Sequence, residues 1–327
     1  MPADGPVRAT AALLAVLLTG CVSRGPAMPS AAEAGVPVRL ELEQTPFFPQ
    51  VEYECGPAAL ATVLAASGLR VVPDDIAPEV YLPGRRGSLQ PELLASARRR
   101  GRLPYVLPGS LETVVQQVAA GFPVLVLQKL GAGPWPGWHY AVVVGYDLDS
   151  GNLQLRSGTD RRLEMSAHRF MMSWDRAERW AVVVLRPGEL PASAQPGRYM
   201  EAAASLESVG EVDAARDAYL AAAGRWPQDP LTRIALGNVA LARGELEAAE
   251  RAYAEAVHLD RQNVPARNNL AEVLLRRGCP TAARAEIEAA ARLAAGGPYA
   301  TAVADTAGQI ASVRGADHPG CPLPEAE

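Results

Sequence analysis

Several residue types are scarce in this sequence. Among its 327 residues there are four histidines, four cysteines and a single lysine, Lys129. No two histidines have the spacing of ligands on one helix, and no two cysteines lie close together in the chain, so no metal site is expected. The net charge of −5 does not favour nucleic-acid binding. Gly84 and Gly87 only flank arginines and follow no expected strand, so neither a phosphate loop nor a cofactor is predicted.

A long apolar run is also missing near the N-terminus. Residues 11–18 are apolar but too few to span a membrane, and their number fits the core of a signal peptide. The stretch ends in the letters LLTGC, and this resembles the lipobox of bacterial lipoproteins. The resemblance implies lipidation of Cys21, and Val22 in place of an aspartate implies the outer membrane, facing the periplasm. An ordinary secretory signal that contains a cysteine is the alternative.

The composition predicts folded domains after this leader. Hydrophobic residues make up 49% of the chain and charged residues 20%, which is typical of globular proteins. Changes in pattern along the chain divide it into six segments: a signal peptide (1–20), a flexible tether (21–36), an α+β domain (37–187), a Pro/Gly/Ser-rich linker (188–198), helical repeats (199–315) and a polar tail (316–327).

The α+β assignment follows from the order of helix and strand signals. Expected helices begin at about Cys55, Pro91 and Leu111, and each is followed by a glycine that ends it. Apolar and β-branched runs later in the domain predict strands over residues 122–129, 139–147, 152–156 and 180–185. Because helices come first and hairpin-linked strands follow, an antiparallel sheet is expected. The arginines at 98–100 are interpreted as a solvated helix end.

The C-terminal third repeats itself every 34 residues. This period, with glycine at the inner turn and small residues where paired helices touch, is the signature of tetratricopeptide (TPR) repeats. We expect an all-α TPR solenoid of three repeats, closed by a capping helix over 298–314, whose concave groove binds a protein partner. The positions that keep the spacing are Gly210, Gly244 and Gly278, then Ala214, Ala248 and Ala282, and finally Tyr219, Tyr253 and Ile287.

Cys55 and His139 are the residues that favour a catalytic function. Cys55 stands at an expected helix start with Pro57 in the first turn, where free N–H groups stabilise a thiolate and lower the thiol pKa from about 8.5. Gly56 leaves space for a substrate carbonyl. His139 opens an apolar strand, where an unpartnered imidazole is costly. The pair fits a nucleophile and its general base. A buried structural cysteine and a satisfied core histidine are the alternatives.

Two motifs carry a family resemblance over about residues 44–187. The stretch ECGPAAL around Cys55 and the stretch WHYAVVVGY around His139 resemble the bacteriocin-processing (double-glycine) cysteine peptidases. The resemblance implies a papain-like fold, and an oxyanion donor at Gln50, although the family's spacing is one residue longer. Where that family has an orienting aspartate, this sequence has Ser157. Asp160 lies close by as a possible substitute.

Two functions remain open at this point. The first is an envelope-anchored cysteine peptidase or amide hydrolase that acts on a peptide or protein. The second is an interaction or scaffold lipoprotein, weakly active or inactive, in envelope assembly. Because the periplasm is oxidising, and Cys21 and Cys55 have other assignments, Cys279 and Cys321 are predicted to form a disulfide.

Overall fold

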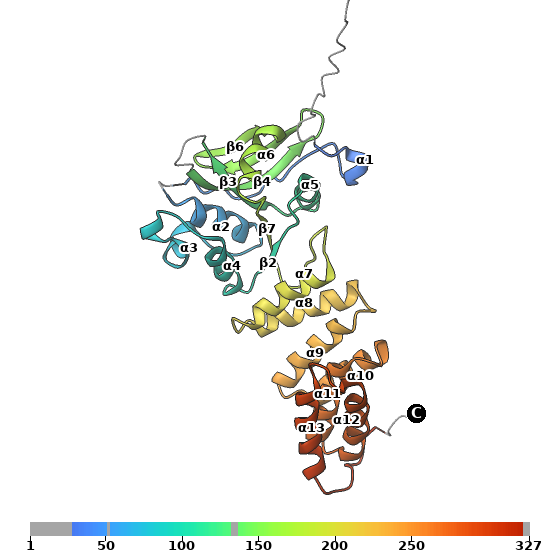
Figure 1. Ribbon diagram of the computed structural model, residues 1–327. Helices are drawn as coiled ribbons and strands as arrows, with labels where there is room; N and C mark the ends of the chain where they lie inside the picture. Colours follow the sequence, from blue (N-terminus) through green and yellow to red (C-terminus); the bar gives the residue numbers. More distant parts are fainter. Residues whose placement is uncertain (1–27, 51–52, 132–136, 323–327) are drawn as a thin grey trace, which may run out of the picture.

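The structure is a computed structural model that describes residues 28–50, 53–131 and 137–322. The expected signal peptide and Cys21 lie outside the described residues. Figure 1 shows an N-terminal region built on a sheet, from which a column of helices extends toward the C-terminus. None of the helices described is long and apolar enough to cross a membrane.

The N-terminal region is built on one seven-stranded sheet in the order β2-β7-β3-β4-β5-β6, with β1 paired to β4, and every pairing is antiparallel. The antiparallel sheet and the four expected strands are therefore confirmed. Strands β1, β2 and β6 were not expected, because two are very short and β6 is rich in charge. The strands are β1 (Arg39–Glu41), β2 (Leu103–Val106), β3 (Val124–Leu130), β4 (Gly137–Asp147), β5 (Asn152–Ser157), β6 (Asp160–Ser166) and β7 (Ala181–Leu185).

Helices cover both faces of this sheet. Strand β4 alternates between them: Tyr140, Val142 and Val144 pack with the apolar side chains of α2, α3 and α4, whereas Ala141 and Val143 face α5 and α6. The α+β prediction for this region is thus confirmed. Its helices are α1 (Ala31–Ala34), α2 (Cys55–Ala66), α3 (Pro73–Val80), the 3₁₀ turn η1 (Pro83–Arg85), α4 (Gln90–Arg98), α5 (Leu111–Ala119) and α6 (Ala167–Asp175).

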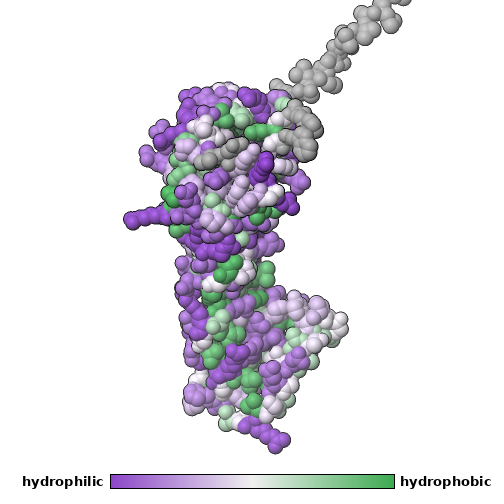
Figure 2. All heavy atoms as spheres, turned by 90° about the vertical axis from the view of Figure 1, so that its left-hand side faces the viewer, coloured by the Kyte–Doolittle hydropathy of each residue, from purple (hydrophilic) through white to green (hydrophobic). Residues whose placement is uncertain are grey.

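The C-terminal region is all-α. Gly210, Gly244 and Gly278 have φ of 85°, 75° and 77° in the turns between paired helices, a left-handed conformation that favours glycine. On the face in Figure 2, green apolar patches over these helices are interrupted by purple hydrophilic side chains. The helices are α7 (Pro196–Glu207), α8 (Val212–Arg225), α9 (Pro230–Ala242), α10 (Leu246–Leu259), α11 (Val264–Arg276), α12 (Pro280–Ala294) and α13 (Ala300–Ser312), the last at the expected capping position.

The segment expected to be a free linker, 188–198, is fixed to the sheet region. Helix α7 already begins at Pro196. The side chain of Gln117 donates to Ser193 Oγ (2.9 Å) and accepts from the Ala192 N–H (3.0 Å). Buried Tyr199 of α7 belongs to the same apolar cluster as β2 and β7. The expected linker is therefore bonded to α5 and β2 through its polar groups, while most of its residues stay at least partly exposed.

The end of the expected tether, 21–36, is also ordered where it is described. Helix α1 has a capping box in which Ser30 and Glu33 bond each other's backbone N–H groups. Gln116 of α5 donates to the Ala34 carbonyl (3.4 Å). Residues 28–36 thus form a short capped helix against α5 rather than a free tether.

The predicted disulfide between Cys279 and Cys321 is confirmed. It joins the N-cap of α12 to the tail, with 5.5 Å between the two Cα atoms. Two further bonds hold the tail to the same turn: the Thr281 N–H donates to Asp317 Oδ1 (2.8 Å), and the His318 N–H donates to the Gly278 carbonyl (2.9 Å). The tail is therefore attached to the turn between α11 and α12.

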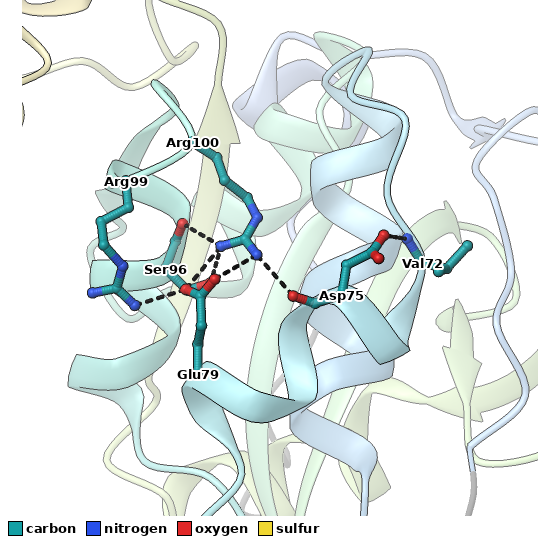
Figure 3. Close-up of polar contacts among 6 residues, drawn as sticks. All are labelled: Val72, Asp75, Glu79, Ser96, Arg99 and Arg100. Atoms are coloured by element: carbon teal, nitrogen blue, oxygen red, sulfur yellow. Dashed lines mark hydrogen bonds and ion pairs between the residues drawn. The ribbon is translucent and has the colours of Figure 1, made fainter.

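The arginines at the end of α4 were expected to be solvated. Two of them, Arg99 and Arg100, instead bond a residue of α3. Arg100 donates to both carboxylate oxygens of Glu79 (2.9 and 2.7 Å), and Arg99 adds a third bond (2.7 Å). Arg100 also donates to the Asp75 carbonyl (3.0 Å) and to Ser96 Oγ (2.6 Å). Figure 3 shows Glu79 of α3 between the two guanidinium groups. This clamp ties together the two helices that flank the loop of residues 81–89.

Replacing Glu79 by Gln should lower the free energy of unfolding by about 1 kcal/mol at neutral pH, since the ion pairs are partly exposed. Arg100 and its hydrogen bonds lower the pKa of Glu79 from 4.5 to about 2. A depressed folded-state pKa gives stability that is complete above pH 4.5 and is lost as the pH falls toward 2. Urea unfolding from neutral to acid pH should show the wild-type advantage shrinking over that window. Exposed Glu201→Gln is the control, and a pH-independent difference would contradict the clamp.

Candidate active site

Cys55 is the first residue of α2, and its surroundings favour a sulfur anion only in part. The N-cap residue, Glu54, makes no side-chain cap, and the backbone N–H groups of Cys55 and Gly56 interact with the sulfur instead. A Cβ on Gly56 would collide with Ser88 Oγ and lie 2.6 Å from Ser88 Cβ. The expectation that Gly56 makes room for a substrate carbonyl is therefore corrected: its missing side chain makes room for Ser88.

His139 lies near the start of β4 and is held from the neighbouring strand. Its Nε2 is 2.8 Å from Oγ of Ser157, a buried residue at the end of β5. This bond leaves Nδ1 as the ring nitrogen that is free to act. Asp160, the other candidate for orienting the ring, pairs with Ser157 across the β5–β6 turn, but it is exposed. No hydrogen bond or ion pair joins Asp160 to His139 within the described ranges.

Gln50 is fixed at both its backbone and its side chain. Its N–H donates to the Gly158 carbonyl (3.0 Å), and its Nε2 donates to the Tyr140 carbonyl (3.2 Å). An amide nitrogen carries two hydrogens, so a second N–H remains available. Gln50, Cys55 and His139 line one cleft of about 870 Å³. The cleft is also lined by Tyr53, Arg85, Arg86, Gly87, Ser88, Leu89, Gln90, Leu127, Gly137, Trp138 and Tyr140.

Burial dominates the protonation of both candidate catalytic groups. It raises the pKa of the Cys55 thiol, although the N–H groups of Tyr140, Gly56 and Cys55 itself oppose this. Burial also lowers the pKa of His139. Both directions favour a neutral thiol beside a neutral imidazole. Desolvation thus opposes the expected lowering of the thiol pKa by the helix N-terminus, and its effect is the larger of the two.

The sequence left several parts of this cleft unnoticed. Tyr140 donates from its hydroxyl to the Ser88 carbonyl (3.3 Å), and burial raises its pKa. Its position inside the histidine motif was a usable signal, whereas nothing in the sequence marked Ser88 or the Arg85–Arg86 loop. Among the residues with described positions, no cluster of three His, Cys, Asp or Glu side chains could hold a metal ion.

Three solved structures resemble parts of the chain at low identity. A protein described as a C39-like peptidase from Bacillus anthracis is 19% identical over 45% of this chain and 98% of its own, with a TM-score of 0.37. The peptidase domain of Streptococcus ComA, a bifunctional ABC transporter, is 20% identical over 43% and 98%, with a TM-score of 0.36. The Yersinia enterocolitica type III secretion translocator chaperone SycD is 22% identical over 36% and 91%, with a TM-score of 0.34.

The match to a protein family is more direct. No curated protein matches the chain. Residues 42–179, however, match the Peptidase_C39 like family, and this span contains Gln50, Cys55, His139, Ser157 and Asp160. The resemblance found in the two motifs is thus confirmed at the level of the family. The N-terminal part of this chain is thus similar to the Peptidase_C39 like family.

Proposed function

We propose that this domain is a cysteine-dependent hydrolase of peptide or amide bonds. The observation that carries the proposal is the meeting of Cys55 and His139 in one cleft, with His139 Nε2 occupied by Ser157. A nucleophile, a base and a group that orients the base are the three parts that thiol hydrolysis requires.

The proposed reaction begins with both groups neutral. As Cys55 Sγ attacks the substrate carbonyl carbon, His139 takes the thiol proton, and the carbonyl oxygen becomes an oxyanion. The oxyanion collapses, the C–N bond breaks, and His139 returns the proton to the leaving amine. Water then attacks the thioester while His139 accepts its proton. The acid is released, and the proton returns to the Cys55 sulfur.

Gln50 is proposed as a donor to the oxyanion. Its side chain lines the cleft and has a second amide hydrogen to donate, and its backbone N–H is bonded to Gly158 in the β5–β6 turn. Donors held in place before the reaction stabilise the developing charge most strongly. Asp160, being exposed, is not given a role in the proposed mechanism.

Ser157 is proposed as the residue that positions His139. Ser157→Ala should lower kcat by roughly tenfold with little change in KM, because the ring loses its orienting bond. Ser157→Asp should shift the acid limb of the pH–rate profile to higher pH, because a carboxylate stabilises the imidazolium. Steady-state kinetics over a pH series measures both effects. Unchanged kcat in Ser157→Ala together with an unshifted profile in Ser157→Asp would remove Ser157 from the site.

The experiment for the hydrolase function uses the free thiol. Cys55 is the free cysteine of the described chain, so iodoacetamide on folded protein modifies this residue selectively. Protein with Cys21 replaced by Ser is incubated with a complex peptide mixture before and after alkylation, and products are read by mass spectrometry. We expect cleavage that alkylation abolishes. Intact peptides in both samples would favour the second candidate, a peptidase-like binding module.

The N-terminal leader is proposed to anchor this domain to a membrane, and the C-terminal helices are proposed to bind its substrates or partners. The 34-residue spacing and the paired helices support TPR repeats that bind a peptide or protein partner. The LLTGC letters support lipidation of Cys21 and anchoring to the outer membrane. Cys21→Ser should move the protein from the membrane fraction to the soluble periplasmic fraction. Wild-type protein found soluble, with its signal peptide cut elsewhere, would contradict the anchor.

A further inference from the structure

The active-site cleft carries a charge pattern that its chemistry does not require. Among its described lining residues are two arginines, Arg85 and Arg86, and no aspartate or glutamate. Glu54 and Glu92 lie on the elements that bound the cleft but do not line it. Arg85 and Arg86 are thus the basic side chains among the described lining residues, although the Glu92 carboxylate is close enough to add to the effect of burial in raising the pKa of Tyr140.

The loop that holds these arginines is closed and held at both ends. The Leu82 N–H donates to the Gly87 carbonyl (2.8 Å), and the Arg86 N–H donates to the Pro83 carbonyl (3.2 Å). Arg86 has φ of 48°, a left-handed conformation that is uncommon outside glycine. Strained backbone at a side chain that lines a cleft is a recurring feature of binding sites. The Glu79 clamp joins the two helices on either side of this loop.

Among the residues that the structure describes, neither arginine has an acidic partner. No ion pair joins Arg85 or Arg86 to a carboxylate in the part of the chain that the structure describes, whereas Arg99 and Arg100, just after α4, are both paired. The Arg86 guanidinium instead lies over the ring of Tyr53, 5.6 Å from the ring centroid. Tyr53 precedes Cys55 by two residues. The unpaired charge is thus placed beside the nucleophile's own segment.

A third cation, Lys129, does not line the cleft but contacts a residue that does. Lys129 Nζ lies 5.1 Å from the centroid of the Trp138 ring, which is 56% exposed and precedes His139. Two cation–aromatic pairs therefore flank the cleft, each with its aromatic ring among the lining residues. A guanidinium group binds a carboxylate with paired, charge-assisted hydrogen bonds.

We infer that the cleft selects peptides that carry an aspartate or glutamate side chain next to the scissile bond, with Arg85 and Arg86 binding its carboxylate. The inference rests on the proposed hydrolysis by Cys55 and names the substrate class of that same site. The exposed rings of Tyr53 and Trp138 accommodate apolar neighbours of the acidic residue.

The test uses internally quenched peptides in pairs that differ only by Glu or Gln at each position around the cleaved bond. Wild-type protein should prefer the Glu member by on the order of tenfold in kcat/KM at low salt, and less at high salt. In Arg85→Gln/Arg86→Gln the ratio should fall to about one. The double variant Arg85→Lys/Arg86→Lys keeps the positive charge and should retain part of the preference for Glu peptides. Exposed Arg70→Gln, in the same domain, is the matched control and should keep the full ratio.

Binding of the same pairs to Cys55→Ala protein, measured by fluorescence anisotropy, separates the two proposals. Tighter binding of Glu peptides that depends on Arg85 and Arg86 supports the inference even if no peptide is cleaved, in which case the hydrolase function alone fails. Equal binding and equal cleavage of both members of every pair would overturn the inference and leave the hydrolase function in place. Thermal melting of each variant confirms that the fold is intact.

Discussion

Cys55→Ala should abolish peptide hydrolysis, with a loss on the order of 10⁶-fold for an enzyme that depends on one nucleophile. The thioester cannot form without the sulfur, and no second free thiol lies in the described chain. The residue is half-buried at the start of α2, and alanine fits the same helix position without a cavity of consequence. The fold and peptide binding should therefore survive, so the loss reports chemistry rather than unfolding.

The assay for this variant is cleavage of quenched peptides, with thermal melting as the test of folding. Cys55→Ser gives a matched control, since the hydroxyl keeps the shape but is a far weaker nucleophile at neutral pH. The serine variant should retain at most a trace of activity. Cleavage by Cys55→Ala at the wild-type rate would show that the reaction has another origin and would leave Cys55 as a packed side chain.

His139→Ala should lower kcat/KM by about 10²- to 10⁴-fold, the usual contribution of a general base. It should also slow alkylation of Cys55 by iodoacetamide near neutral pH. Because burial raises the thiol pKa, little thiolate exists without a base to take the proton as the sulfur attacks. The matched control is His168→Ala, since His168 is exposed on α6 and should leave both rates unchanged.

The pH dependence gives a second measurement of the same residue. Burial lowers the pKa of His139 below its ordinary 6.5, so the imidazole stays neutral to more acidic pH. The acid limb of kcat/KM should therefore lie below 6.5 and should be absent from the residual activity of His139→Ala. An alkylation rate for Cys55 that does not depend on His139 would exclude the proposed pair and favour a binding module.

Much of the helix and strand pattern could be predicted because its signals are local. Pro57 in the first turn and Gly68 beyond the last turn predicted the two ends of α2 to within a residue. Ser110 caps α5, as expected. The antiparallel sheet followed from apolar runs separated by turn residues. By contrast, α3 and β6 were missed: α3 contains Pro78, and the letters of β6 are mostly polar because that strand lies at the sheet edge.

Some residues of the candidate site could likewise be predicted from the sequence, and others could not. Gln50, Cys55 and His139 stand out because each lies in a short motif with a chemical reason for its residue type. The choice between Ser157 and Asp160 could not be made from the letters, since it depends on which side chain the β5–β6 turn directs toward β4. The contact of Ser88 with Gly56 likewise joins segments that only packing brings together.

By itself the sequence determined the order of an α+β region and a helical region, the two residues of the candidate catalytic pair, and the cysteines of the disulfide, because periodicity, turn residues and elimination act within the chain. Only the tertiary structure decided that Ser157 contacts His139, that 188–198 is bonded to α5 and β2, and that two arginines line the cleft without an acidic partner among the described residues. It also showed that burial raises the pKa of the Cys55 thiol and lowers the pKa of His139. Burial and cross-strand contacts depend on residues distant in the chain, and desolvation there exceeds the local effect of a helix N-terminus on the Cys55 thiol.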